Sequence, residues 1–161
     1  VNHSGMNVDH MRWFEPFHHA ILWEDKVPHS YLTEKDHNGT FYPRTDDQEA
    51  NDTQSEYVIV HFALQSPRLS KKIYVNGEWS NGEFSEDCQM QYNEEYGLYE
   101  ASILLKQGYY DYQYITDDGA TADTMGNFWQ TENEYQTFIY YKESGSRYDR
   151  IVGYTRVNTR F

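Results

Sequence analysis

Alternating apolar and polar positions predict β-strands along most of this chain. Between residues 57 and 64 every even position is apolar and the odd positions are mixed, which is typical of a strand with one strongly buried face. The segments 98–105 and 109–116 alternate in the same way. Because Gln107-Gly108 ends the first segment and the second follows at once, we predict that they form a hairpin.

Turn residues divide the chain between these strands. Asn76-Gly77 and Asn81-Gly82 are dipeptides that supply the positive φ angles of tight turns. The run Asp117-Asp118-Gly119 closes the strand that precedes it. These signals predict short connections between neighbouring strands.

Weaker patterns occur on both sides of this region. Further strand candidates are 20–23, 39–42, 135–141 and 151–157. The segment 46–56 is polar and acidic, as expected of a loop or linker. The spacing of strands and turns predicts an all-β, immunoglobulin-like sandwich over 57–161. Residues 1–56 are then an N-terminal extension with short strands and an acidic linker.

Composition excludes several classes of protein. The chain has 161 residues, enough for one domain with a substantial core. Its 13 Lys and Arg face 26 Asp and Glu, which gives a net charge of −13, and such a surface repels nucleic acid and anionic lipid. Aromatic residues make up 17% of the chain, whereas disordered chains are poor in aromatic residues. The single cysteine, Cys88, excludes an intramolecular disulfide, and no apolar run reaches the roughly 20 residues of a membrane helix.

The last twenty residues are basic within an acidic chain. Residues 142–161 hold five Lys and Arg against two Asp and Glu, a local balance of +3. Such an end either docks on a partner or pairs with carboxylates of the protein itself. Both interpretations are compatible with the sequence.

Histidines and acidic residues are the first candidates for a metal or catalytic site. His18 and His19 stand near Asp9 and His10, and imidazole and carboxylate are ordinary metal ligands. Adjacent strand residues point to opposite faces, however, so the two histidines should not reach one ion. Cys88 has no Cys-x-x-Cys partner, and the sequence contains no Gly-x-Ser-x-Gly, His-Glu-x-x-His or phosphate-loop motif. We therefore predict no metal site, no cofactor and no enzymatic activity.

Part of the predicted sandwich resembles the early-set immunoglobulin-like domains that bind glycogen and starch. The resemblance rests on residues 74–79, Met90, 97–100 and 105–114. Those domains stack sugars on flat tryptophan platforms, and the two platform positions fall near Gly82 and Ala120. A displaced platform would have to use Trp79 and Trp129, which makes recognition of α-glucan-like glycans the alternative function. The competing interpretation is a buried Trp that anchors the core.

A second resemblance covers nearly the whole chain. It rests on seven separated blocks, namely residues 5–9, 17–20, 36–41, 57–62, 104–110, 131–135 and 147–153. In content and order these blocks resemble the C-terminal part of the type IX secretion system plug protein family of Bacteroidota. The resemblance implies a periplasmic protein, associated with the outer membrane, that closes the inner mouth of the large β-barrel translocon. It also implies an N-terminal β-domain ahead of the residues present here.

Together these patterns predict a non-enzymatic domain that binds another protein. We expect the partner to be the outer-membrane β-barrel translocon, with no nucleic acid bound and no membrane insertion by this chain. Tyrosine and arginine dominate the energetics of protein interfaces, and the candidate contact residues are Arg147, Tyr148, Arg150 and Trp129. The competing interpretation of 147–150 is a structural turn in which Asp149 holds a flanking arginine.

Overall fold

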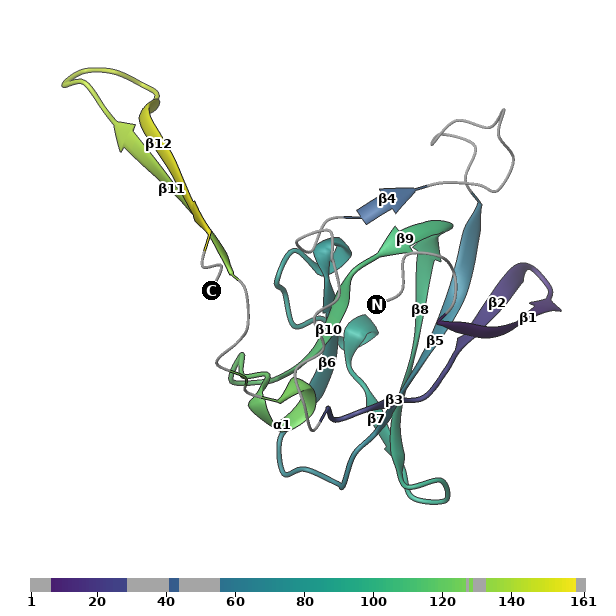
Figure 1. Cartoon of the computed structure of the whole chain (residues 1–161). Helices are drawn as coiled ribbons and strands as arrows, with labels where there is room; N and C mark the ends of the chain where they lie inside the picture. Colours follow the sequence, from purple (N-terminus) through teal and green to yellow (C-terminus); the bar gives the residue numbers. More distant parts are fainter. Residues whose placement is uncertain (1–6, 29–40, 44–55, 127, 129–132, 159–161) are drawn as a thin grey trace. The chain divides into compact units, whose positions relative to one another are not determined.

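The computed structural model of the chain describes residues 7–28, 41–43, 56–126, 128 and 133–158 (Figure 1). The chain divides into two compact units, Val1–Asn127 and Phe128–Phe161. Within the described residues the strands are interrupted by α1 (Ala122–Met125) and by the 3-10 turns η1 (Glu78–Ser80) and η2 (Glu86–Cys88). The two units are described separately.

The main sheet of the first unit runs in the order β1–β2–β5–β8–β7, and β3 also pairs with β5. Its strands are β1 (Val8–Phe14), β2 (Phe17–Leu22), β3 (Asp25–Lys26), β5 (Tyr57–Gln65), β7 (Gln91–Asn93) and β8 (Leu98–Lys106). β5 is antiparallel to β8 and parallel to β2, where Ala20 lies opposite Val60. The predicted boundary at residue 56 therefore lies inside one compact unit, because the N-terminal segment adds strands directly to the main sheet.

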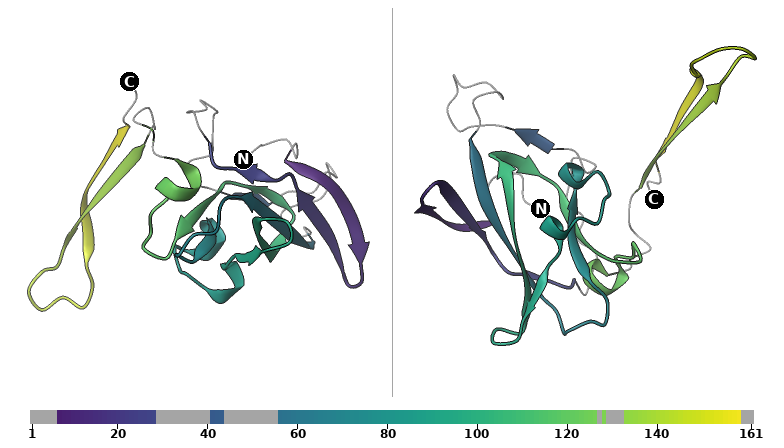
Figure 2. Two further views of the ribbon diagram at one scale, coloured as in Figure 1. Left: turned by 90° about the horizontal axis from the view of Figure 1, so that it is seen from below. Right: turned by 180° about the vertical axis from the view of Figure 1, so that it is seen from behind.

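A second layer faces this sheet, as two further views of the first unit show (Figure 2). It consists of β6 (Ile73–Gly77) and β10 (Tyr112–Thr116), which are antiparallel. Nearby, β4 (Phe41–Pro43) pairs with β9 (Gly108–Tyr110). The prediction of an all-β, immunoglobulin-like sandwich with an N-terminal β extension is confirmed in its strands and layers.

The predicted hairpin between 98–105 and 109–116 is wrong. Both segments form strands, but β8 pairs with β5 and β7, whereas β10 pairs with β6 in the other layer. The chain crosses between the layers at Gln107-Gly108. This crossing lets Leu105 and Tyr114, which are 6% and 1% exposed, face the same core from opposite sides.

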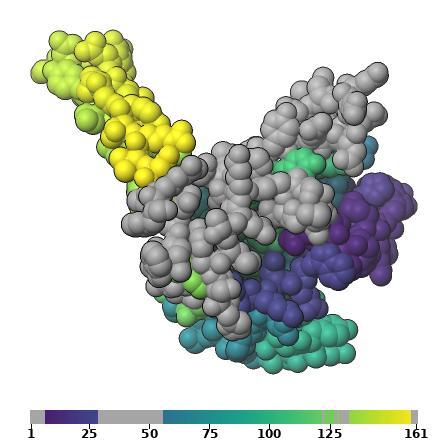
Figure 3. Space-filling model, in the orientation of Figure 1, coloured from purple at the N-terminus to yellow at the C-terminus, as the bar shows by residue number. Residues whose placement is uncertain are grey.

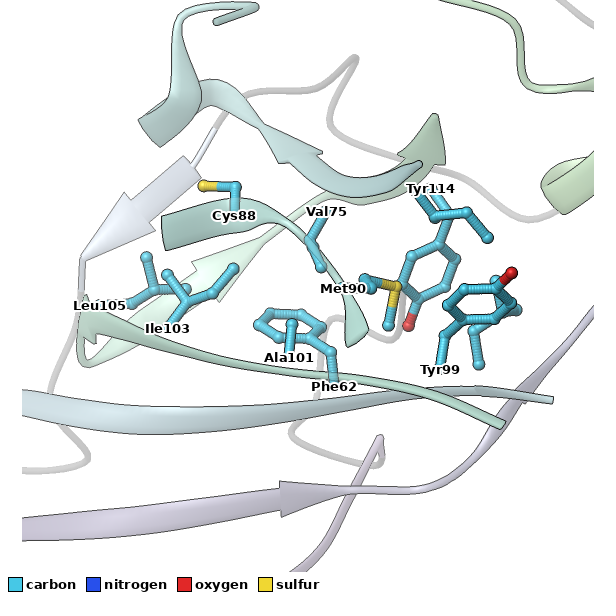
Figure 4. Packing of buried hydrophobic residues seen from close by; sticks show 11 residues of the cluster. Phe62, Val75, Cys88, Met90, Tyr99, Ala101, Ile103, Leu105 and Tyr114 are labelled. Atoms are coloured by element: carbon cyan, nitrogen blue, oxygen red, sulfur yellow. The ribbon is translucent and has the colours of Figure 1, made fainter. Parts of the chain in front are cut away.

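The core lies between the two layers (Figure 4). Its buried residues are Phe62, Leu64, Ile73, Val75, Cys88, Met90, Tyr99, Ala101, Ile103, Leu105 and Tyr114. The even positions of β5 and the odd positions of β8 supply six of these eleven residues, as the alternation predicts. Each fully buried aliphatic side chain of this kind stabilises the fold by about 1.5–3 kcal/mol.

Glycines explain two of the three predicted turns. Asn81 and Gly82 have φ angles of 49° and 73°, and Gly119 has a φ of 78°, so both turns are confirmed. Gly77 is different, because its φ of −147° is extended. A Cβ on Gly77 would lie 2.1 Å from the Trp79 ring. Glycine is needed here for close approach of a side chain, and the predicted positive φ is wrong.

A carboxylate joins the N-terminal extension to the sandwich. Oδ2 of Asp25 in β3 accepts hydrogen bonds from the hydroxyls of Tyr112 and Tyr114, each at 2.6 Å. Asn7 Nδ2 donates to the Tyr112 hydroxyl at 2.9 Å. Burial, followed by the charges of neighbouring groups, raises the pKa of both tyrosines well above 10. Both hydroxyls therefore keep their protons and remain donors to Asp25.

The second unit is a hairpin of β11 (Glu134–Tyr141) and β12 (Arg150–Asn158). The strands are antiparallel, with Phe138 opposite Tyr154 and a register shift between Ile139 and Tyr140. The strands predicted over 135–141 and 151–157 are confirmed. They form a separate two-stranded sheet, although the sequence predicted them as part of the sandwich over 57–161, because alternation identifies a strand but not the sheet that it joins.

Candidate functional site

The β11–β12 hairpin exposes large apolar side chains, and its atoms are yellow and green in the space-filling view (Figure 3). Nine of them are between 45% and 62% exposed, namely Tyr135, Phe138, Ile139, Tyr140, Tyr141, Ile151, Val152, Tyr154 and Val157. Adjacent strand residues such as Phe138 and Ile139 point to opposite faces. Both faces of the hairpin are therefore apolar and accessible.

The strands of this hairpin also have open edges. Among the strands that the structure describes, β11 and β12 pair only with each other. Each strand consequently presents an outer row of backbone N–H and C=O groups without a strand partner. A lone two-stranded hairpin is at best marginally stable in water, so an added strand or apolar face would complete this structure.

The predicted contact residues Arg147, Tyr148 and Arg150 lie where the hairpin turns. Arg147 and Tyr148 belong to the connection, and Arg150 begins β12. The Ser146 hydroxyl donates to the Tyr148 carbonyl at 3.0 Å, and the Ser146 N–H donates to the Glu143 carbonyl at 2.9 Å. Tyr148 is 67% exposed, and both arginines are exposed.

Asp149 does not hold this turn. Within the described part of the chain, no ion pair joins Asp149 to either flanking arginine, and the hydrogen bonds of Ser146 fix the turn instead. The predicted structural turn is thus present without its predicted ion pair. Its two arginines remain directed to solvent, where a partner can reach them.

One arginine of the basic end is used internally. Arg156 Nη2 forms an ion pair with Glu134 Oε2, and Gln136 Nε2 donates to Glu134 Oε1 at 2.7 Å. The Arg156 side chain is 51% exposed and the Glu134 side chain 14%, so water screens this ion pair mainly from the arginine side. Within the basic end, Arg156 therefore pairs with a carboxylate of the protein itself. Arg147 and Arg150 are exposed and can contact a partner.

The tryptophans predicted for a glycan platform do not form one in the described residues. Trp129 lies outside the described residues. Trp79 packs on the core against Phe62 and Tyr110, with ring centroids 6.3 and 5.6 Å apart. Trp79 acts as the core anchor of the competing interpretation, so the glycan hypothesis lacks an open ring face at this position.

A cavity of about 800 Å³ opens on the first unit, and the sequence did not predict it. Its walls come from β1, β2, β5, β8, β9 and β10, and they include the rings of Tyr109, Tyr110 and Tyr112. The Tyr110 hydroxyl donates to the Lys106 carbonyl at 2.6 Å. Burial, with a smaller effect of Tyr57, raises the pKa of Tyr110 to about 12. The walls also include charged side chains, such as Asp9 and Glu56, so the cavity is mixed in polarity.

The histidines near the amino terminus separate as the strand geometry predicts. His18 lines the cavity and contacts the Trp13 ring, with centroids 4.6 Å apart. His19 lies on the other face, where its Nδ1 is 2.7 Å from Nε2 of His61. This contact could not be predicted from the sequence, because its two residues are 42 positions apart. Within the described residues no group of three or more His, Cys, Asp or Glu is placed to hold a metal ion.

The His61 ring lies in a polar row on this outer face. Its Nδ1 is 2.9 Å from Ser102 Oγ. Burial lowers the pKa of His61, and His19 lowers it further, against the opposing effect of Glu100. His61 is therefore held mainly as the neutral imidazole at neutral pH.

Comparison with known proteins gives a structural relative. No protein-family model matches the chain, and no curated protein matches it. The chain is similar to the crystal structure of a hypothetical protein from Parabacteroides merdae ATCC 43184 at 2.30 Å resolution, with 37% identity and a TM-score of 0.84. The match covers 96% of this chain and 41% of that one. Among the described residues, no helix has the length and apolar character that a membrane crossing requires.

Proposed function

We propose that this chain is a protein-binding domain whose contact surface is the β11–β12 hairpin. One observation carries the proposal: nine large apolar side chains remain 45–62% exposed on a hairpin that joins no other described strand. Burial of the exposed half of such a side chain yields about 1 kcal/mol. Nine of them offer up to about 9 kcal/mol, which offsets the cost of bringing the two partners together and ordering their side chains.

The chemistry of the hairpin favours a protein over other partners. Tyrosine and arginine are enriched in interfaces, where their flat side chains bury area and still form hydrogen bonds. Tyr148, Arg147 and Arg150 form a polar rim at the turn, beside the apolar strands. The net charge of −13 for the chain disfavours nucleic acid.

The family resemblance supports a specific partner. We take it to be the periplasmic side of an outer-membrane β-barrel translocon of the type IX secretion system, which this chain would close as a plug. A periplasmic location follows from that role. The open edges of β11 and β12 support strand addition as the binding mode, because an extra strand would satisfy their outer backbone groups. Apolar side chains on both faces would then pack on the partner.

Site-specific photocrosslinking in the full-length protein tests this function. A photoreactive amino acid replaces Ile139 or Tyr154 in cells that contain the translocon. We expect adducts with the outer-membrane barrel from both hairpin positions. The control position is Tyr96, which is 68% exposed in the connection between β7 and β8. Adducts from Tyr96 but none from the hairpin would refute the proposed surface.

A double variant tests the basic rim separately. Arg147→Ala/Arg150→Ala should reduce co-purification with the barrel severalfold, because two exposed charges at the rim are lost. The matched control is Arg12→Ala/Lys72→Ala, which removes two exposed charges from the first unit. If Arg147→Ala/Arg150→Ala co-purifies with the barrel at the wild-type level, the turn is not part of the interface.

A further inference from the structure

The two strands of the β11–β12 hairpin differ at their outer edges. Between Glu134 and Lys142, β11 has seven consecutive residues without a charge, a glycine or a proline. The large apolar side chains among them are 45–62% exposed. A segment of this composition on an open edge is typical of a strand that accepts another strand.

The outer edge of β12 is protected by contrast. Opposite the step from Ile139 to Tyr140, β12 has one extra residue, Val152. Such a bulge interrupts the regular row of outer backbone groups. β12 also carries Arg150 and Arg156, and bulges and charged side chains both keep edge strands from pairing. The accepting edge of the hairpin is therefore that of β11.

We propose that β11 pairs with β11 of a second copy of this chain, in an antiparallel arrangement centred on Phe138. Glu134 and Lys142 each stand four residues from Phe138, so this pairing places Glu134 of each copy opposite Lys142 of the other. Opposite charges in direct cross-strand pairs stabilise a sheet. Between the two ends every pair joins uncharged residues, with Tyr135 opposite Tyr141.

The charge pattern disfavours the other symmetric pairings of this hairpin. A parallel pair of β11 strands would place Glu134 opposite Glu134. In β12, Arg150 and Arg156 each stand three residues from Gly153, so an antiparallel pair centred there would place arginine opposite arginine. Like charges directly opposite each other destabilise a sheet. Among these arrangements, only the antiparallel pair of β11 strands joins opposite charges.

The charged groups at both ends of β11 can form these contacts. Lys142 is exposed and forms no ion pair within the described residues. Each carboxylate oxygen of Glu134 has one partner, Arg156 or Gln136, and a carboxylate has about four acceptor sites. The contact uses the same edge of both copies, so it closes on itself. The protected strand β12 then forms both outer edges of the joint sheet and stops further growth.

This pairing goes beyond the proposed function, because it requires only the chain itself. It would also cover the edge of β11 to which a strand of the barrel would add. The second copy and the barrel would then compete for β11, and the dimer would protect an edge that is otherwise open to aggregation.

Engineered cysteines test the register in the purified chain, without any barrel protein. Directly opposite residues of an antiparallel pair have Cα atoms about 4.5–5.5 Å apart, which suits a disulfide. Phe138→Cys should therefore form a disulfide-linked dimer under mild oxidation. Tyr135→Cys and Tyr141→Cys should each crosslink poorly alone, since equivalent positions then lie about 20 Å apart, and should crosslink well when mixed. The parent chain is the control for Cys88, which is 4% exposed.

The matched control for this register is the other edge of the hairpin. Ile151→Cys mixed with Thr155→Cys would crosslink if β12 paired with itself around Gly153. We expect no dimer from this mixture, because the bulge and the arginines of β12 oppose that pairing.

Sedimentation velocity measures the dimer without a crosslink. Lys142→Glu should weaken it about fivefold at low salt, because two pairs of opposite charges become pairs of like charge. Lys72→Glu reverses an exposed charge of the first unit and should have no effect. Mixing Lys142→Glu with Glu134→Lys/Arg156→Glu should restore the parent affinity, since the second variant keeps the internal ion pair with reversed signs.

Circular dichroism checks that each variant is folded. A folded chain that stays monomeric, that assembles beyond a dimer, or that crosslinks through β12 instead of β11 would overturn the proposal. None of these results would alter adducts between the hairpin and the barrel in cells, so the dimer and the proposed function can fail separately.

Discussion

Removal of the Tyr114 hydroxyl tests how far the Asp25 cluster stabilises the fold. Tyr114 is 1% exposed, and its hydroxyl donates to Asp25 Oδ2 at 2.6 Å. A hydrogen bond to a charged group contributes about 1.5–3 kcal/mol. Tyr112 donates to the same oxygen and remains in Tyr114→Phe, so we expect the lower half of that range. The free energy of unfolding should fall by about 1.5–2 kcal/mol.

Urea unfolding followed by circular dichroism measures this change. The control is Tyr96→Phe, which removes a hydroxyl from a side chain that is 68% exposed and should change stability by less than about 0.5 kcal/mol. Asp25→Ala should cost about 3 kcal/mol, because it leaves two phenols without their acceptor. In that background Tyr114→Phe should cost almost nothing. If Tyr114→Phe destabilises equally with and without Asp25, the hydrogen bond is not the cause.

Three further predictions follow from the same structure. As the pH rises above 10 the free energy of unfolding should fall, because Tyr112 and Tyr114 lose their protons in the unfolded chain but keep them in the folded protein, where their pKa is raised. Urea unfolding between pH 9 and pH 11 should show a smaller fall in Tyr112→Phe/Tyr114→Phe. Burial lowers the pKa of His61 below 6.5, so the free energy of unfolding should decrease as the pH falls below 6.5 toward the pKa of the folded protein. Urea unfolding at pH 5 and pH 7.5 should show a smaller decrease in His61→Gln than in the parent. Gly77→Ala should cost at least about 2 kcal/mol in urea unfolding, because its Cβ would lie 2.1 Å from the Trp79 ring; a Trp79→Leu background that leaves this cost unchanged would contradict the steric explanation.

The strands of the central sheet follow from the sequence because each has one buried face. In β5 the alternation places Phe62 and Leu64 in the core, and in β8 it places Ile103 and Leu105 there. A period of two residues is a local property, so a single sequence reveals it. The turn at Asn81-Gly82 is equally local, since both residues adopt a positive φ.

Pairing between distant strands could not be predicted in this way. Tyr110, Tyr112 and Tyr114 alternate as expected, yet nothing nearby indicates that β10 pairs with β6. The Asp25 cluster joins residues 87 and 89 positions apart. Such contacts depend on which layer the chain enters after Gly108. That choice is made by packing of the whole core rather than by local propensity.

The candidate contact surface was predicted in its residue types rather than in its shape. Arg147 and Tyr148 are chemically typical of an interface, and both are exposed at the turn. The exposed strands on either side carry the larger apolar area, and their alternation looks the same as that of a buried strand. Trp79 shows the converse difficulty, because a tryptophan just after a turn signal is compatible with either a platform or a core anchor.

The parallel pairing of β2 with β5 has a consequence for the order of folding. Its partners are 40 positions apart, as Ala20 and Val60 show, whereas β11 and β12 meet across one short connection. The entropy cost of closing the longer loop arises before the contacts between β2 and β5 form, so this pairing forms more slowly than a local hairpin. The partners of β5 and β8 are just as distant, since Val58 and Leu105 are 47 positions apart. We therefore expect the local hairpins β1–β2 and β7–β8 to form before either of them joins β5. Changes that weaken only the contact of β2 with β5 would then accelerate unfolding while leaving the formation of these hairpins nearly unchanged.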